Sequence, residues 1–231
     1  MVCEAKKGAR GVCIRQVPIL GSCGQVLRGC VNHQRERARN RGSVFAGVHT
    51  VRKGEVMSVQ VHGVTTLYNG KIFNVVLEKV TLPNGVVKDR EIVRHPGASA
   101  MVPLLDDGSV VLIKQYRHAV GQFVWEIPAG TLEPGEAPLE CARRELVEEI
   151  GYEAAAFDKL TSIWPAPGYT DEHIHIFLST GLTKADQNLE DDEVIETRPT
   201  PLNECLEMIK TSEIQDGKTI IGLLLTSMWN R

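Results

Sequence analysis

The stretch "GTLEPGEAPLECARRELVEEIGY", residues 130–152, places six glutamates and two adjacent arginines between Gly130 and Gly151. Pro138 suits the first turn of a helix and Gly151 suits its end. An apolar stripe spaced for one helix face runs through Leu139, Ala142, Leu146 and Ile150. The stretch therefore predicts an amphipathic helix over residues 137–150.

Three of these glutamates fall on one side of the predicted helix. Each residue advances about 100° around the helix axis. Residues at this spacing lie on the same side of the helix, so Glu145, Glu148 and Glu149 are neighbours there. Like charges this close repel one another. A hard divalent cation would compensate them, and Mg²⁺, which bridges to phosphate oxygens, indicates a phosphorylated substrate. The alternative is a solvated helix face with Arg143 and Arg144 as ion-pair partners, and helix geometry alone does not separate the two.

The spacing of the whole stretch resembles the signature of the Nudix hydrolases. Only Tyr152 departs from it, where an aliphatic residue is usual. The resemblance implies a loop–helix–loop that holds Mg²⁺ (or Mn²⁺ in its place), two or three ions, while water attacks a nucleoside diphosphate linked to a further group. The matching positions are Gly130, Glu136, Arg144, Glu145, Leu146, Glu148, Glu149 and Gly151.

Roles follow from the resemblance for residues of this stretch. Glu145 and Glu149 are expected metal ligands, and Glu148 belongs to the same cluster and to the catalytic group. Arg144 is expected to orient a glutamate by a charge-assisted hydrogen bond. Glu136 would support the loop, an outer metal or the substrate.

The flanking sequence resembles the ADP-ribose pyrophosphatase branch of that family. The segment at 95–136, "HPGASAMVPLLDDGSVVLIKQYRHAVGQFVWEIPAGTLEPGE", carries most of the likeness, together with "DGKTIIGLLL" at 216–225. In this branch the carbonyl of the alanine before the box, here Ala129, binds a metal. Arg117 would contact the substrate's phosphates, with a surface ion pair as the alternative, and Glu126 would lie in the substrate region.

The water-activating carboxylate of this branch comes from a loop beyond the helix. The acidic segment "LEDDEVIE" at 189–196 occupies that place, and Glu193 matches best. Glu196, Asp192 and Glu172 are rivals, and a solvated acidic loop is the alternative for each of them.

The resemblance also implies a fold and an assembly. We expect an α/β protein: a Nudix-type α/β/α sandwich with a mixed sheet, preceded by an N-terminal antiparallel β-hairpin region. The strands at about 67–95 would exchange between the subunits of a homodimer. Arg90 and Arg94 would then reach the partner's substrate.

Turn signals support this arrangement of strands. Asn84-Gly85 predicts one hairpin, and Asp107-Gly108 predicts a second. The expected domains are an N-terminal extension at 1–58, a β-region for dimerisation at 59–98 and a Nudix hydrolase domain at 99–231.

The first 56 residues differ from the rest in composition. They hold 11 Lys and Arg against 3 Asp and Glu, whereas residues 57–231 hold 15 against 26. Their lack of periodicity predicts disorder, or a true start of translation at Met57. A transit peptide, a cysteine metal site and a basic nucleic-acid contact are alternatives.

Composition also bears on location and partners. Only two cysteines, Cys141 and Cys205, lie beyond this segment, which favours a reduced, cytoplasmic protein. There is no run of 18 apolar residues, so we expect no membrane partner. No nucleic-acid partner is expected either.

The expected activity is metal-dependent hydrolysis of ADP-ribose to AMP and ribose 5-phosphate. GDP-mannose, other ADP-sugars and NADH are rival substrates that the motif does not separate. A non-catalytic ADP-ribose sensor is a remote alternative. Such sensors usually have an eroded box and an attached DNA-binding domain, and neither feature is evident here.

Overall fold

The computed structural model describes residues 59–189 and 194–229. The expected N-terminal extension and Glu193 therefore lie outside the described residues. The elements run in chain order as β1 (Gln60–Asn69), β2 (Asn74–Thr81), β3 (Val87–Arg94), β4 (Ala98–Pro103), β5 (Ser109–Arg117), the 3₁₀ turn η1 (His118–Val120), β6 (Gln122–Glu126), β7 (Ala129–Thr131), α1 (Pro138–Ile150), β8 (Tyr152–Ile163), β9 (Ile174–Lys184), β10 (Ile195–Pro201), α2 (Leu202–Lys210) and α3 (Gly217–Trp229).

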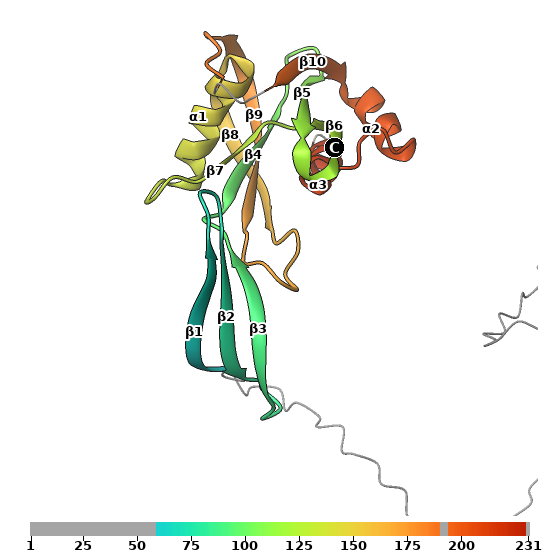
Figure 1. Cartoon of the computed structure of the whole chain (residues 1–231). Coiled ribbons are helices and arrows are strands. Elements are labelled where there is room, and N and C mark those ends of the chain that lie inside the picture. The colour runs from blue at the N-terminus through green and yellow to red at the C-terminus, as the bar shows by residue number, and fades with distance from the viewer. Residues whose placement is uncertain (1–58, 190–193, 230–231) are drawn as a thin grey trace, which may run out of the picture. The chain divides into compact units, whose positions relative to one another are not determined.

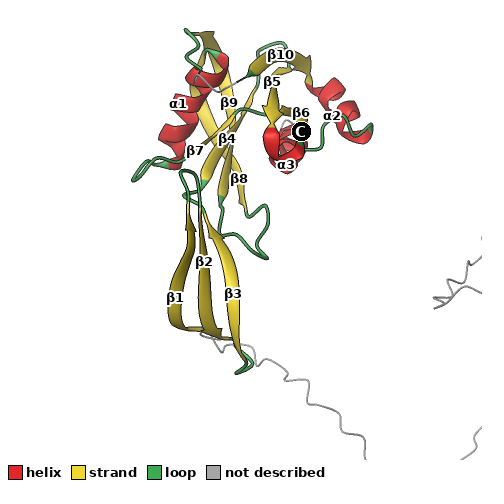
Figure 2. Cartoon of the chain, viewed as in Figure 1, coloured by secondary structure: helices red, strands yellow, loops and turns green. Residues whose placement is uncertain are grey.

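The strands form three sheets (Figure 2). A four-stranded mixed sheet has the order β7-β4-β9-β8, with β4 and β9 parallel and the other neighbours antiparallel. A second sheet has the order β10-β5-β6, and a third has the order β1-β2-β3. The mixed sheet and the N-terminal antiparallel strands confirm the predicted fold class.

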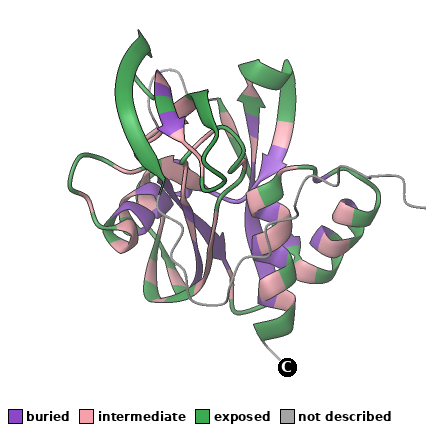
Figure 3. Ribbon diagram, turned by 90° about the horizontal axis from the view of Figure 1, so that it is seen from below, coloured by how far each residue is buried: buried purple, intermediate pink, exposed green. Residues whose placement is uncertain are grey.

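Strand alternation places helices on both faces of the mixed sheet. Met101 of β4 and Phe177 of β9 pack with Leu146 of α1 on one face. Their neighbours Ala100 and Ile176 point the other way and pack with Leu223 of α3. Figure 1 shows α1 and α3 on opposite sides of these strands, and Figure 3 shows the buried residues concentrated between them. Among the described residues, no helix is long and apolar enough to cross a membrane.

The hairpin predicted around Asn84-Gly85 is confirmed. β2 and β3 pair antiparallel across it, and Gly85 has a φ of +80° that glycine adopts without strain. The preceding strand β1 begins at Gln60, well before Leu67, where the strand pattern becomes evident in the sequence. All ten residues of β1 are exposed, so they lack the buried alternation that marks a strand.

The hairpin predicted around Asp107-Gly108 is wrong in its pairing, although its turn forms. Gly108 N–H donates to the Leu105 carbonyl at 2.9 Å, as a turn requires. Beyond one bridge, Leu104 to Val110, the two strands diverge into different sheets. Burial explains why β4 and β5 separate. Every residue of β4 is buried, so other elements must pack on both faces of this strand.

Helix α1 has the ends that the sequence predicts. Pro138 occupies the first turn, where its missing N–H is not needed. Gly151 ends the helix with a φ of +65° and donates to the carbonyls of Leu146 and Val147. A Cβ at Gly151 would also lie 3.0 Å from the Ala185 carbonyl oxygen, so both backbone conformation and space favour glycine there.

A substitution at Leu146 tests how far the stability of the fold depends on the packing of α1. It is fully buried against β4 and β9, so Leu146→Ala should lower the free energy of unfolding by about 2–5 kcal/mol. Urea denaturation followed by circular dichroism measures this. Glu140→Ala is the matched control on the same helix, because its exposed pair with Arg143 spans 3.9 Å and should contribute less than about 1 kcal/mol. Equal effects of the two variants would contradict the packing described here.

Candidate functional site

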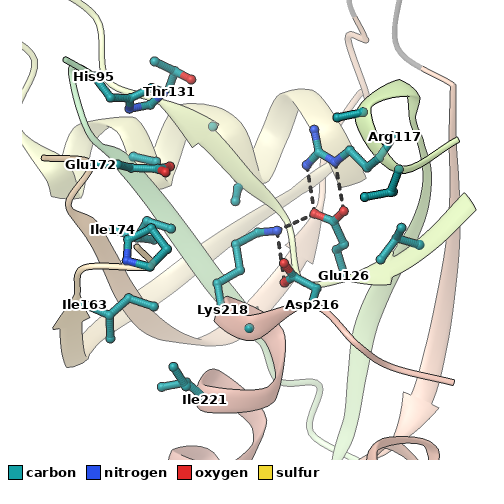
Figure 4. Close-up of a pocket in the computed structure, with 18 of the residues that line it drawn as sticks. His95, Arg117, Glu126, Thr131, Ile163, Glu172, Ile174, Asp216, Lys218 and Ile221 are labelled. Atoms are coloured by element: carbon teal, nitrogen blue, oxygen red, sulfur yellow. Dashed lines mark hydrogen bonds and ion pairs between the residues drawn. The ribbon is translucent and has the colours of Figure 1, made fainter. Parts of the chain in front are cut away.

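A cleft of about 980 Å³ lies where the ends of several elements meet. Its walls come from the end of β5, from β6 and β7, from the loop after β8 and from the start of α3. Figure 4 shows Arg117, Glu126, Lys218 and Asp216 lying together in it. The cleft therefore draws on segments that are far apart in sequence.

Glu126 and Arg117 form a bidentate ion pair in this cleft. Arg117 donates from Nε to Oε1 at 2.9 Å and from Nη2 to Oε2 at 2.8 Å. Arg117 lies opposite Gln122 and Glu126 lies opposite Ile113, so the two residues stand at opposite ends of the paired segment and their side chains reach toward each other. Glu126 is only 3% exposed. Burial alone would raise the pKa of its carboxyl, but the bonds to Arg117 and the charge of Lys218 outweigh burial and lower that pKa.

A second cation reaches the same carboxylate. Lys218 Nζ, from the first turn of α3, donates to Glu126 Oε2 and to Asp216 Oδ2, the latter at 3.1 Å. Asp216 also accepts from the N–H and hydroxyl of Thr219, at 2.9 and 2.6 Å. Lys218 and Asp216 lie in the segment at 216–225, where nothing in the sequence alone predicts a role for them.

Two glutamates of α1 are buried beside Ala129 and Gly130 of β7, which themselves line the cleft. Glu149 is 2% exposed and its Oε2 accepts from Ala129 N–H at 2.8 Å. Glu145 is 9% exposed, and a Cβ at residue 130 would lie 1.7 Å from its Oε1. Gly130 is therefore required for the Glu145 carboxylate to approach the chain. Burial of both carboxylates excludes the solvated-face alternative for them.

Arg144 connects the glutamates of the motif. It donates to Glu136 from Nε at 2.9 Å and from Nη2 at 3.1 Å. Its Nη1 donates to Glu145 at 2.6 Å and to Glu148 at 2.9 Å. The bond from Arg144 lowers the pKa of Glu136. One guanidinium thus offsets the repulsion between neighbouring carboxylates.

Arg143 takes no part in this network. Its guanidinium lies over the ring of Phe157, 4.8 Å from the centroid, and its contact with Glu140 spans 3.9 Å. The two adjacent arginines therefore have different surroundings, and only Arg144 faces the glutamates of the motif.

The oxygen donors at this end fit a hard divalent cation in their chemistry. Carboxylates of Glu145, Glu148 and Glu149 and the carbonyl of Ala129 are ligands that Mg²⁺ and Mn²⁺ prefer. Two of these carboxylates are buried, where a cation would offset the cost of burying their charge. Within residues 59–189 and 194–229, no three His, Cys, Asp or Glu side chains already converge as a ready ligand set.

The remaining predicted residues are placed as follows. Arg94 pairs with Glu78 at 2.5 Å and with Asp171 at 2.8 Å, linking β3 to β2 and to the loop after β8. Arg90 is exposed on β3. Glu172 lines the cleft, whereas Glu196 is exposed on β10. Asp192 and Glu193 lie outside the described residues.

Trp164 is a cleft residue that the sequence does not predict. It lines the cleft while remaining 62% exposed. Its ring stacks on His173 with centroids 5.0 Å apart and planes 19° apart. An exposed aromatic residue in a loop carries no periodic signal, so only the structure identifies it.

Comparison with known proteins gives consistent matches. The family model described as the NUDIX domain matches residues 93–220. An ADP-ribose pyrophosphatase of Bacillus subtilis (strain 168) is 39% identical over 159 residues, covering 68% of this chain and 86% of the relative. A GDP-mannose pyrophosphatase of Shigella flexneri is 38% identical over 154 residues, covering 59% of this chain and 80% of the relative.

A solved structure agrees with the fold. It is described as the crystal structure of an ADP compounds hydrolase and superposes with a TM-score of 0.67 at 22% identity, covering 77% of this chain and 96% of that one. The family match covers more than half of the chain and includes the glutamate-bearing helix α1 and the residues that Arg144 connects. The chain therefore belongs to the Nudix family of hydrolases.

Proposed function

We propose that this protein hydrolyses the diphosphate bond of ADP-ribose, giving AMP and ribose 5-phosphate in a metal-dependent reaction. The observation that carries the proposal is the cleft itself. Its lining includes Arg117, aligned by Glu126, and Ala129, whose N–H binds Glu149 of the carboxylate group suited to a cation. A diphosphate needs both the guanidinium and the cation, because its oxygens bind metal ions and guanidinium groups alike. The B. subtilis relative, an ADP-ribose pyrophosphatase, favours this substrate.

Each side chain has a role in this proposal. Glu145, Glu148, Glu149 and the Ala129 carbonyl hold two or three Mg²⁺ ions, for which Mn²⁺ substitutes. When bound, the ions supply an activated water and neutralise the diphosphate.

The protein's other charged groups then serve orientation. Arg144, aligned by Glu136, orients Glu145 and Glu148 through the bonds at 2.6 and 2.9 Å. Arg117 binds a phosphate group, and Glu126 sets the direction of its guanidinium.

A panel of nucleoside diphosphate substrates tests the proposal. Purified protein with Mg²⁺ is given ADP-ribose, GDP-mannose, another ADP-sugar and NADH, and the products are identified by chromatography. ADP-ribose should show the highest kcat/KM. GDP-mannose is the alternative that the S. flexneri relative favours. Binding of ADP-ribose without cleavage would instead identify a sensor.

Glu149 is the most buried carboxylate of the cluster and gives the sharpest single variant. Glu149→Gln should lower kcat by at least about 10³, because it removes a metal ligand that acts in the transition state. Glu140→Gln on the same helix is the matched control and should retain turnover. Circular dichroism verifies that both variants fold, and near-normal turnover of a folded Glu149→Gln would remove Glu149 from the metal site.

The water-activating base is proposed to be Glu193. Glu193→Gln should lower kcat by about 10² or more with little change in KM, the pattern of an interaction made in the transition state. Glu172, which lines the cleft, is the direct comparison, and Glu172→Gln should have the smaller effect. The reverse order would assign the base to the loop after β8.

A strand-exchanged homodimer is proposed as the working assembly, in which Arg90 and Arg94 approach the partner's substrate. Strand β1 supports it, because all ten of its residues are exposed. Several are apolar and more than half exposed: Val61, Val64, Leu67 and Tyr68. A second copy would cover such a strand.

Sedimentation velocity tests the assembly. Wild-type protein should sediment as a dimer, and Leu67→Lys should shift it toward monomer because a charge is placed in the interface. Met228→Lys, at an apolar residue of α3 that is 60% exposed, is the matched control and should not change the dimer. A monomeric wild type would contradict the proposal.

A cytoplasmic location is also proposed, consistent with Cys141 and Cys205 being free thiols.

A further inference from the structure

Lys218 is a buried cation that the proposed reaction does not yet use. Its side chain is 10% exposed, and its Nζ lies between Glu126 and Asp216 at the start of α3 (Figure 4). Burying an ammonium group costs free energy unless partners offset it. Contact with water therefore does not explain why a lysine occupies this position.

Glu126 does not require a second cation. Arg117 already donates to both of its carboxylate oxygens. Adding Lys218 gives one carboxylate shared by two cations, so this group of three carries a net positive charge. Asp216 balances that charge, so the four groups together carry no net charge, and its Oδ2 also accepts two bonds from Thr219. Lys218 therefore adds no net charge to the cleft, and its contact with Glu126 serves to hold that carboxylate in place.

The contacts also fix the direction of Arg117. Its bonds to Glu126 use Nε and Nη2 and leave Nη1 outside the pair. Glu126 is itself held by Lys218, which belongs to the first turn of α3. The same turn is hydrogen-bonded to the residue that follows β6, because Ile127 N–H donates to Thr219 Oγ1 at 2.8 Å. The start of α3 is thus bonded to Glu126 and, through Glu126, to the guanidinium of Arg117.

We propose that Lys218 is a positioning residue for the nucleoside diphosphate. It holds Glu126 from the side of α3, so that Arg117 directs Nη1 at a phosphate oxygen. This inference rests on the proposed function, since the phosphate recognised is that of the substrate. Lys218 acts through Glu126 and Arg117, and does not itself touch the substrate.

Steady-state kinetics with ADP-ribose tests the inference. Lys218→Met keeps the chain length and removes the charge, and it should raise KM about tenfold while changing kcat less than about threefold. Lys218→Arg restores the charge and should recover most of the lost affinity. Lys210→Met is the matched control, because Lys210 forms an exposed pair with Glu207 on α2, and it should leave KM unchanged.

A double-mutant cycle separates positioning from direct contact. In an Arg117→Ala background, Lys218→Met should raise KM by less than about twofold, because the residue it positions is already absent. Additive effects would show that Lys218 contacts the substrate directly and would overturn the proposal. A lower melting temperature with unchanged KM would also overturn it, since Lys218 would then be structural only.

A second variant keeps the test valid if Lys218→Met does not fold. Removing one partner of a buried ion pair can unfold a protein, whereas removing both is tolerated better. If Lys218→Met does not fold, Glu126→Gln combined with Lys218→Met replaces it, and the same rise in KM is expected. An unchanged KM in the folded double variant would contradict the inference.

Failure of the proposed function can be told apart from failure of this inference. If the wild-type protein hydrolyses no member of the panel, the proposed function is wrong. Calorimetric binding of ADP-ribose in Ca²⁺ then tests Lys218, and Lys218→Met should weaken binding about tenfold. Equal affinity of the two proteins, or no binding by either, would overturn the inference.

Discussion

Repulsion among the carboxylates of α1 is the constraint on which the site depends. Glu145, Glu148 and Glu149 share one side of a helix, and two of them are buried. Such an arrangement is unstable unless positive charge and hydrogen-bond donors lie close by. The structure supplies both, through the guanidinium of Arg144 and the backbone N–H of Ala129. Gly130 supplies the space, because any side chain there would collide with the Glu145 carboxylate.

The sandwich brings the charged groups of α1 and α3 together from opposite faces of one sheet. α1 contributes the glutamates from one side, and α3 contributes Lys218 from the other. The chain between Glu126 and Gly130 joins the two, since Glu126 contacts Lys218 while Ala129 contacts Glu149. Burial of β4 on both faces is what holds the helices in register with this chain. The packing of the core therefore also determines the geometry of the site.

Local signals in the sequence predicted the parts of this structure that local physics determines. The helix at 137–150 and the turn at Asn84-Gly85 follow from spacing, capping and backbone preference. The separation of β4 from β5 could not be predicted this way, because it depends on which distant elements cover β4. Lys218 was missed for a similar reason: it lies 92 residues from Glu126 in sequence, and no spacing rule connects them.

Glu126 also keeps the two kinds of charge in the cleft apart. The hydrogen bond to Glu126 is the main cause that raises the pKa of Arg117, and the charge of Glu149 raises that pKa further. Without a partner of its own, Arg117 would be drawn toward the carboxylates of α1 and would compete with a cation for them. Because Glu126 is buried and held by Lys218, Arg117 is already satisfied in its place. In the proposed function, Arg117 then binds one phosphate group while a cation held by the glutamates of α1 binds the same diphosphate.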